Sequence, residues 1–137
     1  MRPPIIACIT LLLASAAADG AVAVLHPDLA NQRLDRDRVA GMLMGRISTW
    51  SDGTPVVVVL MDGQAAVADL TGREVPRLLR GWKRLVFSGS ATMPTQVASI
   101  GDVVRQCMAA RGAIAILDQP PTDPGTALVI TLADPAP

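Results

Sequence analysis

Aromatic residues are scarce in this 137-residue chain, which has two Trp, one Phe and no Tyr. Cysteine and histidine are also scarce: the sequence has Cys8, Cys107 and a single His26. A metal centre generally needs three or four ligands from His, Cys, Asp or Glu, and no spacing typical of such a centre occurs. Glycine-rich nucleotide loops and G-x-S-x-G nucleophile motifs are absent as well. We therefore predict no metal, no cofactor and no catalytic residue, and a protein that is not an enzyme.

One catalytic pair is formally available, with Cys107 as nucleophile and His26 as its base. Cys107 recurs with Ile100 and Val103 at helical intervals, which places it on the apolar face of a helix. A buried cysteine behaves as a small hydrophobic residue. We therefore interpret Cys107 as part of the core.

Net charge is absent, because 12 basic residues balance 12 acidic ones. Nucleic-acid-binding domains usually concentrate positive charge, so this balance argues against a nucleic-acid partner.

The N-terminus has the pattern of a secretory signal peptide: Arg2 near the start, an apolar run over residues 5–13 and small residues over 14–18. This run is shorter than the roughly 18 residues of a membrane-spanning helix, and no later run is long enough. We predict a periplasmic or secreted protein that is not membrane-spanning, with cleavage near Ala18. Residues 19–133 are then long enough for one domain, and residues 134–137 form a frayed tail.

Strand and helix patterns alternate along this domain. The expected strands span residues 21–25, 56–60, 113–117 and 127–132. Four helices are expected. The first two span residues 36–44 and 64–70. The third has Pro76 in its first turn and ends before Phe87, and the fourth runs from Ser99 to Gly112. This alternation favours an α/β fold of three α/β/α layers with a parallel or mixed sheet.

The three aromatic residues are interpreted as hydrophobic anchors. Trp82 shares a predicted helix face with Leu78 and Leu85, and Phe87 adjoins Val86. The alternative is that Trp50, Trp82 and Phe87 stack on a ligand.

Two loops are candidate anion sites. In open α/β folds, ligands bind outside the carboxyl ends of strands, where loops lead into helix N-termini, and this rule points to the loops after Leu60 and Phe87. Backbone N–H groups at such positions can hold phosphate without a dedicated motif. The candidate residues are Asp62, Gly63 and Gln64 in the first loop and Ser88, Gly89 and Ser90 in the second. The alternative is that both loops are ordinary turns.

Arg77, Arg80 and Arg84 lie within one arc of the predicted helix. We interpret them as a solvated outer face. The alternative is a surface that binds an acidic partner or an anion.

Several motifs occur in a fixed order between Ala21 and Leu117: His26-Pro27, Gly45, Trp50-x-Asp52-Gly53, Phe87-x-Gly89 and Gly112-Ala113-Ile114. In this order they resemble the phosphate-binding-protein family of ABC transporters, specifically its small, single-lobe, exported members. The resemblance implies a periplasmic-binding-protein-like lobe that binds phosphate or another small anion weakly. It also implies an ABC transporter or a periplasmic protein as partner.

The sequence departs from the family pattern where an oxyanion is usually held. That segment commonly carries an Arg with small hydroxyl or glycine residues, whereas residues 62–67 here contain neither Arg nor Ser. The alternative expectation is a periplasmic interaction or regulatory module that has the same fold and binds no ligand.

Overall fold

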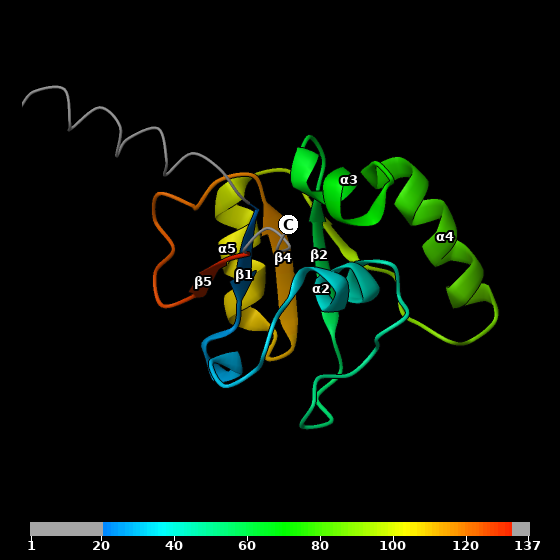
Figure 1. Cartoon of the computed structure of the whole chain (residues 1–137), viewed down its shortest axis with the longest axis horizontal. Helices are drawn as coiled ribbons and strands as arrows, with labels where there is room; N and C mark the ends of the chain where they lie inside the picture. Colours follow the sequence, from blue (N-terminus) through cyan, green and yellow to red (C-terminus); the bar gives the residue numbers. More distant parts are fainter. Residues whose placement is uncertain (1–20, 133–137) are drawn as a thin grey trace, which may run out of the picture.

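The structure, a computed structural model, describes residues 21–132 and contains one five-stranded sheet (Figure 1). The predicted signal peptide and the predicted tail lie outside the described residues. The strands are β1 (Val22–Leu25), β2 (Val57–Met61), β3 (Thr95–Val97), β4 (Ala113–Leu117) and β5 (Leu128–Thr131), arranged in the order β3-β2-β4-β1-β5. β2 is parallel to β3 and β4, whereas β1 is antiparallel to β4 and β5. The sheet is therefore mixed.

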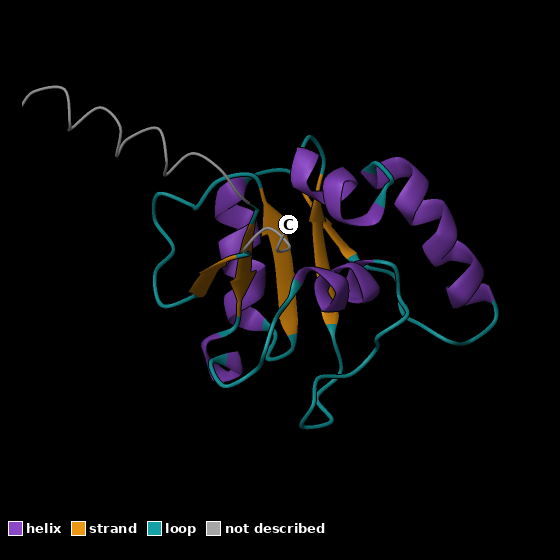
Figure 2. Ribbon diagram, viewed as in Figure 1, coloured by secondary structure: helices purple, strands orange, loops and turns teal. Residues whose placement is uncertain are grey.

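Helices cover both faces of the sheet (Figure 2). They are α2 (Arg36–Leu43), α3 (Ala65–Thr71), α4 (Val75–Phe87) and α5 (Ile100–Ala109), and a 3-10 turn, η2, spans Pro27–Leu29. α2, α3 and α4 pack on one face, and α5 packs on the other. This confirms the predicted three-layer α/β/α fold. No helix among residues 21–132 is both long and apolar enough to span a membrane.

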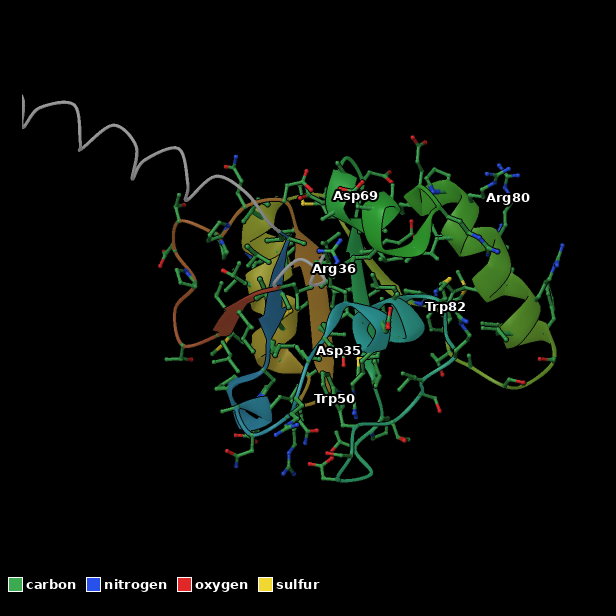
Figure 3. The ribbon with its side chains drawn as sticks, viewed as in Figure 1. Asp35, Arg36, Trp50, Asp69, Arg80 and Trp82 are labelled. Atoms are coloured by element: carbon green, nitrogen blue, oxygen red, sulfur yellow. The ribbon has the colours of Figure 1, made fainter. Side chains whose placement is uncertain are left out.

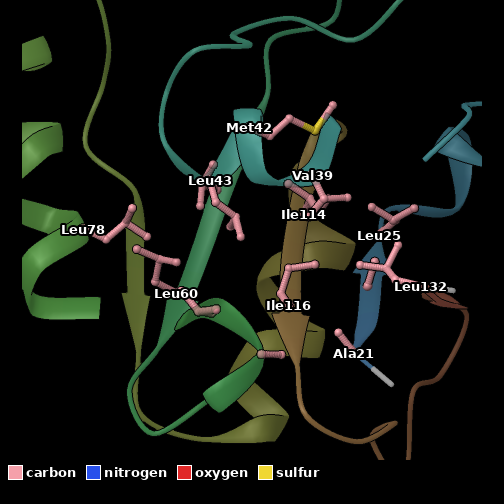
Figure 4. Close-up of a cluster of buried hydrophobic side chains, with 14 of the residues drawn as sticks. Ala21, Leu25, Val39, Met42, Leu43, Leu60, Leu78, Ile114, Ile116 and Leu132 are labelled. Atoms are coloured by element: carbon pink, nitrogen blue, oxygen red, sulfur yellow. The ribbon is translucent and has the colours of Figure 1, made fainter. Parts of the chain in front are cut away.

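The alternation of side chains along each strand explains how one sheet contributes to a hydrophobic core on each of its two faces. Ile114 and Ile116 of β4 face α2 and α3 in the larger cluster of buried side chains (Figure 4). Ala113, Ala115 and Leu117 alternate with them and face α5 on the opposite side. All five residues of β4 are buried, because this central strand is covered on both faces.

The two Trp side chains are core anchors, as predicted. Trp50 is 2% exposed and its Nε1–H donates to the carbonyl oxygen of Gly112 at 2.9 Å. Trp82 is 7% exposed and its Nε1–H donates to the carbonyl oxygen of Leu43 at 2.7 Å. The Trp82 contact holds α4 against the end of α2.

The prediction that Phe87 is a core anchor is wrong, because its side chain is 88% exposed. Phe87 is the last residue of α4, nine positions after the buried Leu78. At about 100° per residue, that spacing turns Phe87 to the opposite side of the helix. α4 also continues through Phe87, whereas the sequence predicted an end before it.

β3 was not predicted. It has only three residues, of which Gln96 is exposed, and it pairs with β2 alone at the edge of the sheet. A strand this short carries little periodicity of its own.

Candidate functional site

Three strands end at one edge of the sheet, which we call the carboxyl edge. β2, β3 and β4 are parallel, and Met61 of β2 is in register with Val97 of β3. The loop of Asp62, Gly63 and Gln64 follows β2 at this edge and leads into α3, which lies above β2 in Figure 1. Ligands of open α/β folds bind at such an edge. The first predicted loop is therefore at the expected place.

The start of α3 holds a carboxylate of the chain itself. The backbone N–H groups of Ala65 and Ala66 donate to the two carboxylate oxygens of Asp118, at 3.0 and 2.7 Å. The backbone N–H of Asp118 in turn donates to Oε1 of Gln64 at 2.8 Å. Charge-assisted bonds of this kind are stronger than bonds between neutral groups. Asp118 thus occupies the position at which an oxyanion would meet the N-terminus of α3.

The start of α5, the other helix that begins at the carboxyl edge, is also capped internally. The hydroxyl oxygen of Ser99 accepts a hydrogen bond from the backbone N–H of Asp102 at 3.1 Å. The Asp102 carboxylate accepts from Nη1 of Arg105 at 2.6 Å. Both helix starts at this edge therefore use side chains of the protein to satisfy their free N–H groups.

The other residues of the first loop have different positions. Asp62 is exposed, and its carboxylate has no hydrogen-bond partner among residues 21–132. Gly63 has a φ of 86°, a left-handed conformation that favours glycine in a tight turn. Gln64 precedes the first residue of α3 and uses its side chain to hold Asp118. The loop is thus a turn whose polar contacts are directed at Asp118.

The second predicted loop caps the end of a helix. The backbone N–H of Gly89 donates to the Val86 carbonyl at 3.0 Å, and that of Ser90 donates to the Leu85 carbonyl at 2.8 Å. This pair of bonds, with Gly89 at a φ of 79°, is a Schellman motif. The amides are therefore already hydrogen-bonded, at a helix end whose dipole disfavours anions.

The hydroxyl groups of the second loop are also engaged. Ser88 Oγ donates to the Leu85 carbonyl oxygen at 3.0 Å and lies 2.9 Å from Ser90 Oγ. The expectation that this loop follows the carboxyl end of a strand is wrong, since Phe87 ends α4. A helix was expected before this loop, so the loop should have been assigned to a helix end and not to the carboxyl end of a strand.

The two predicted loops lie at opposite edges of the sheet. Ser90 lines a cavity of about 190 Å³ that also includes Pro55 and Val56, the residues that lead into β2. That cavity is smaller than the roughly 300–1,000 Å³ of typical small-molecule sites. Anion binding at Asp62, Gly63, Gln64, Ser88, Gly89 or Ser90 stays a prediction, and the geometry does not combine them into one site.

Cys107 and His26 have separate structural roles. Cys107 is buried, and its thiol donates to the Val24 carbonyl oxygen at 3.4 Å. Burial raises the pKa of this thiol to about 12, so the nucleophilic thiolate is not populated near neutral pH. His26 precedes η2 and accepts the backbone N–H of Asp28 through Nδ1 at 3.0 Å. Among residues 21–132, no group of three or more His, Cys, Asp and Glu could hold a metal ion.

Asp118 was missed by sequence reasoning, which gave no role to the residues between the expected strands 113–117 and 127–132. A usable signal was present, because this carboxylate directly follows the buried strand β4. The carboxyl ends of β2 and β4 are adjacent, so an acidic residue there reaches the helix that follows β2.

No family model matches the sequence, and no curated protein matches it at a significant level. Among solved structures, the fold is similar to the crystal structure of an ABC-type phosphate transport receptor from Vibrio cholerae, with a TM-score of 0.55 and 18% sequence identity. The match covers 86% of this chain and 48% of the receptor, so the chain spans about half the receptor's length. At this identity the likeness shows the fold alone. The protein has a periplasmic-binding-protein-like α/β fold.

Proposed function

We propose that this protein is an exported, non-catalytic module with a periplasmic-binding-protein-like fold, which acts through its surface in interaction or regulation. The observation that carries the proposal is the double hydrogen bond from Ala65 and Ala66 to Asp118. A phosphate at the start of α3 would have to displace that carboxylate, because two anions at one helix start repel each other.

Ligand burial depends on more than the described lobe. The chain corresponds to about half of the similar phosphate transport receptor. Because ligand sites usually bury most of the ligand surface, a small ligand at the carboxyl edge of this lobe would need a second lobe or another chain to cover it.

Weak binding of phosphate or another small anion is the second candidate function. It is favoured by the likeness to a phosphate transport receptor, and it would make an ABC transporter the expected partner. The loops of Asp62, Gly63 and Gln64 and of Ser88, Gly89 and Ser90 would then supply the binding groups.

Isothermal titration separates the two candidates. The protein purified from the exported fraction is titrated with phosphate, sulfate and small carboxylates. We expect no saturable heat at millimolar anion. Saturation at one site, abolished by Gly89→Asp and retained in the control Gly125→Asp, would overturn the proposal in favour of anion binding. Gly125 is a suitable control because it also has a positive φ, of 60°, with no atom within 4 Å of an added Cβ.

Export is tested independently. The signal pattern before Ala18 predicts that a periplasmic extract contains a shortened chain beginning near Asp19. N-terminal sequencing or intact mass would establish the cleavage position. Recovery of only the uncleaved chain in the cytoplasm would contradict the predicted location.

A further inference from the structure

α4 carries four cationic side chains and no acidic one. Arg77, Arg80, Lys83, Arg84 and Phe87 are all exposed, and the helical repeat places them within an arc of about 120°. We call these five residues the outer face of α4. Figure 3 shows Arg80 on this side and Trp82 on the side toward α2.

The positive charge of the outer face has no internal partner. Among residues 21–132, none of these four cationic side chains forms an ion pair or a hydrogen bond. Elsewhere, by contrast, Arg105 pairs with Asp102 and Arg111 with Asp28. Like charges three or four positions apart, as in this arc, destabilise a helix. Solubility alone would be served as well by mixed charges.

A fifth cation extends the same surface. Nη1 of Arg73 lies 3.5 Å from the position that a Cβ atom on Gly81 would take. On the helical repeat Gly81 lies about 40° beyond Arg77, at the border of the outer face. The Arg73 side chain thus runs along α4 and adds its charge to this side.

Phe87 gives the outer face an apolar end. It is the one large hydrophobic side chain that is exposed among residues 21–132. Arg and aromatic residues are the types most enriched at the energetic centres of protein interfaces, where Lys is depleted. This surface has three Arg, one Lys and one Phe.

A hollow of about 540 Å³ lies at the N-terminal end of the outer face. Arg77 and Arg80 line it, together with Ala68, Gly72, Glu74 and Pro76. Two guanidinium groups beside one depression can each hold a carboxylate through paired N–H donors.

We propose that the outer face of α4 is the docking surface for an acidic protein segment, whose carboxylates meet the arginines and whose apolar side chain covers Phe87. This inference rests on the proposed interaction function and names the surface and its partner chemistry. An anionic membrane fits less well, because the apolar face of α4, with Leu78 and Trp82, is buried in the core. Phe87 alone is then left to insert into lipid.

The test uses a synthetic 12-residue peptide of Glu with one central Leu. This peptide is titrated into isotopically labelled protein, and backbone amide shifts are followed by NMR. We expect saturable amide shifts confined to α4 and its flanking residues. The affinity for the peptide should fall steeply as the salt concentration rises. No shift in α4, or shifts spread evenly over the surface, would overturn the proposal.

Charge-reversal variants locate the binding. Arg80→Glu with Arg84→Glu should weaken the affinity at least tenfold. The control, Arg33→Glu with Arg105→Glu, makes the same change in net charge on exposed residues elsewhere and should change the affinity less than twofold. Equal weakening by both pairs would mean that only net charge matters. If the first pair fails to fold, Arg80→Gln with Arg84→Gln takes its place, with at least a threefold loss expected.

Phe87→Ser tests the apolar contact. This substitution should lower the affinity for the Leu-containing peptide severalfold and leave the affinity for an all-Glu peptide unchanged. Vesicles of phosphatidylglycerol are titrated in parallel, and tighter binding to the vesicles than to the peptide would overturn the proposal in favour of a lipid surface.

The phosphate titration distinguishes failure of this inference from failure of the proposed function. If phosphate gives no saturable heat and the peptide causes no amide shifts in α4, only the proposed docking surface is disproved. Saturable phosphate binding at one site defeats the proposed function, whatever the peptide does.

Discussion

The start of α3 and the outer face of α4 both hold groups that attract anions, and they differ in what occupies them. At the start of α3 the N–H groups are satisfied by Asp118, two hydrogen bonds to one carboxylate. On the outer face of α4, four cationic side chains have no partner among the described residues. The difference indicates that the start of α3 already holds a carboxylate of the protein itself, while the cations on the outer face of α4 are left open to an external anion.

The largest expected effect comes from removing the anchor of α4. Trp82→Ala deletes a buried indole and its bond to the Leu43 carbonyl, so we expect a loss of about 3–5 kcal/mol in the free energy of unfolding. Denaturant titration measures the loss. In this variant, hydrogen exchange should show a larger loss of amide protection in α4 than in α3, which would mean that the two helices open independently. Equal loss of protection in both helices would mean that they form one cooperative unit.

The next effect concerns the internal carboxylate. Asp118→Ala leaves two N–H groups at the start of α3 without their acceptor, and we expect a loss of about 1–3 kcal/mol in stability. Asp62→Ala is the matched control, since this exposed carboxylate has no partner among the described residues, and it should change stability by less than about 0.5 kcal/mol. Similar losses in the two variants would contradict a special role for Asp118.

Cys107 is a buried titratable group, in contrast to the exposed cationic side chains of α4. Its pKa is raised from the ordinary value of 9.0 to about 12 by burial, so between these values the unfolded chain loses a proton that the folded protein keeps. Unfolding therefore becomes easier as pH rises above about 9, by up to about 1.4 kcal/mol per pH unit.

Denaturant titrations between pH 8 and 11 measure this slope. Few other groups titrate in that range, because the sequence has one Lys and no Tyr. Cys107→Ala should be less stable at neutral pH but should show a flatter dependence above pH 9. An unchanged slope would assign the effect to another group.

The smallest effect is expected on the outer face of α4. Arg80→Glu relieves repulsion with Arg77 and Arg84, so stability should stay within about 0.5 kcal/mol of the original protein or rise slightly. Thermal melting checks this. A loss above 1 kcal/mol would show that Arg80 is needed for folding, and the contrast with the start of α3 would fail.

Most of the fold could be predicted from the sequence, because strong local patterns and burial agree. The run of apolar residues from Val56 onward marks a central strand, and Pro76 marks the first turn of α4. β3 could not be predicted, because its three residues form a strand only through pairing with β2. Phe87 was misplaced because hydrophobicity alone does not tell an inward from an outward position at the last turn of a helix.

The candidate site was less predictable, because it depends on contacts between distant segments. Asp118 and Ala66 are 52 positions apart, and only the parallel pairing of β2 and β4 brings them together. The second loop failed for a local reason: Ser88, Gly89 and Ser90 have the composition of an anion-binding turn but follow a helix, where their N–H groups close the last turn.

The position of β1 has a consequence for how the chain reaches this fold. β1 is the first strand in the described sequence, yet its two neighbours in the sheet are β4 and β5, near the other end. Val24 pairs with Ala115 on one side and with Val129 on the other. A growing chain cannot complete this sheet until β5 has been synthesised, and pairings of such long sequence separation form slowly. The synthesis of β5 therefore sets the time at which both sides of β1 become hydrogen-bonded.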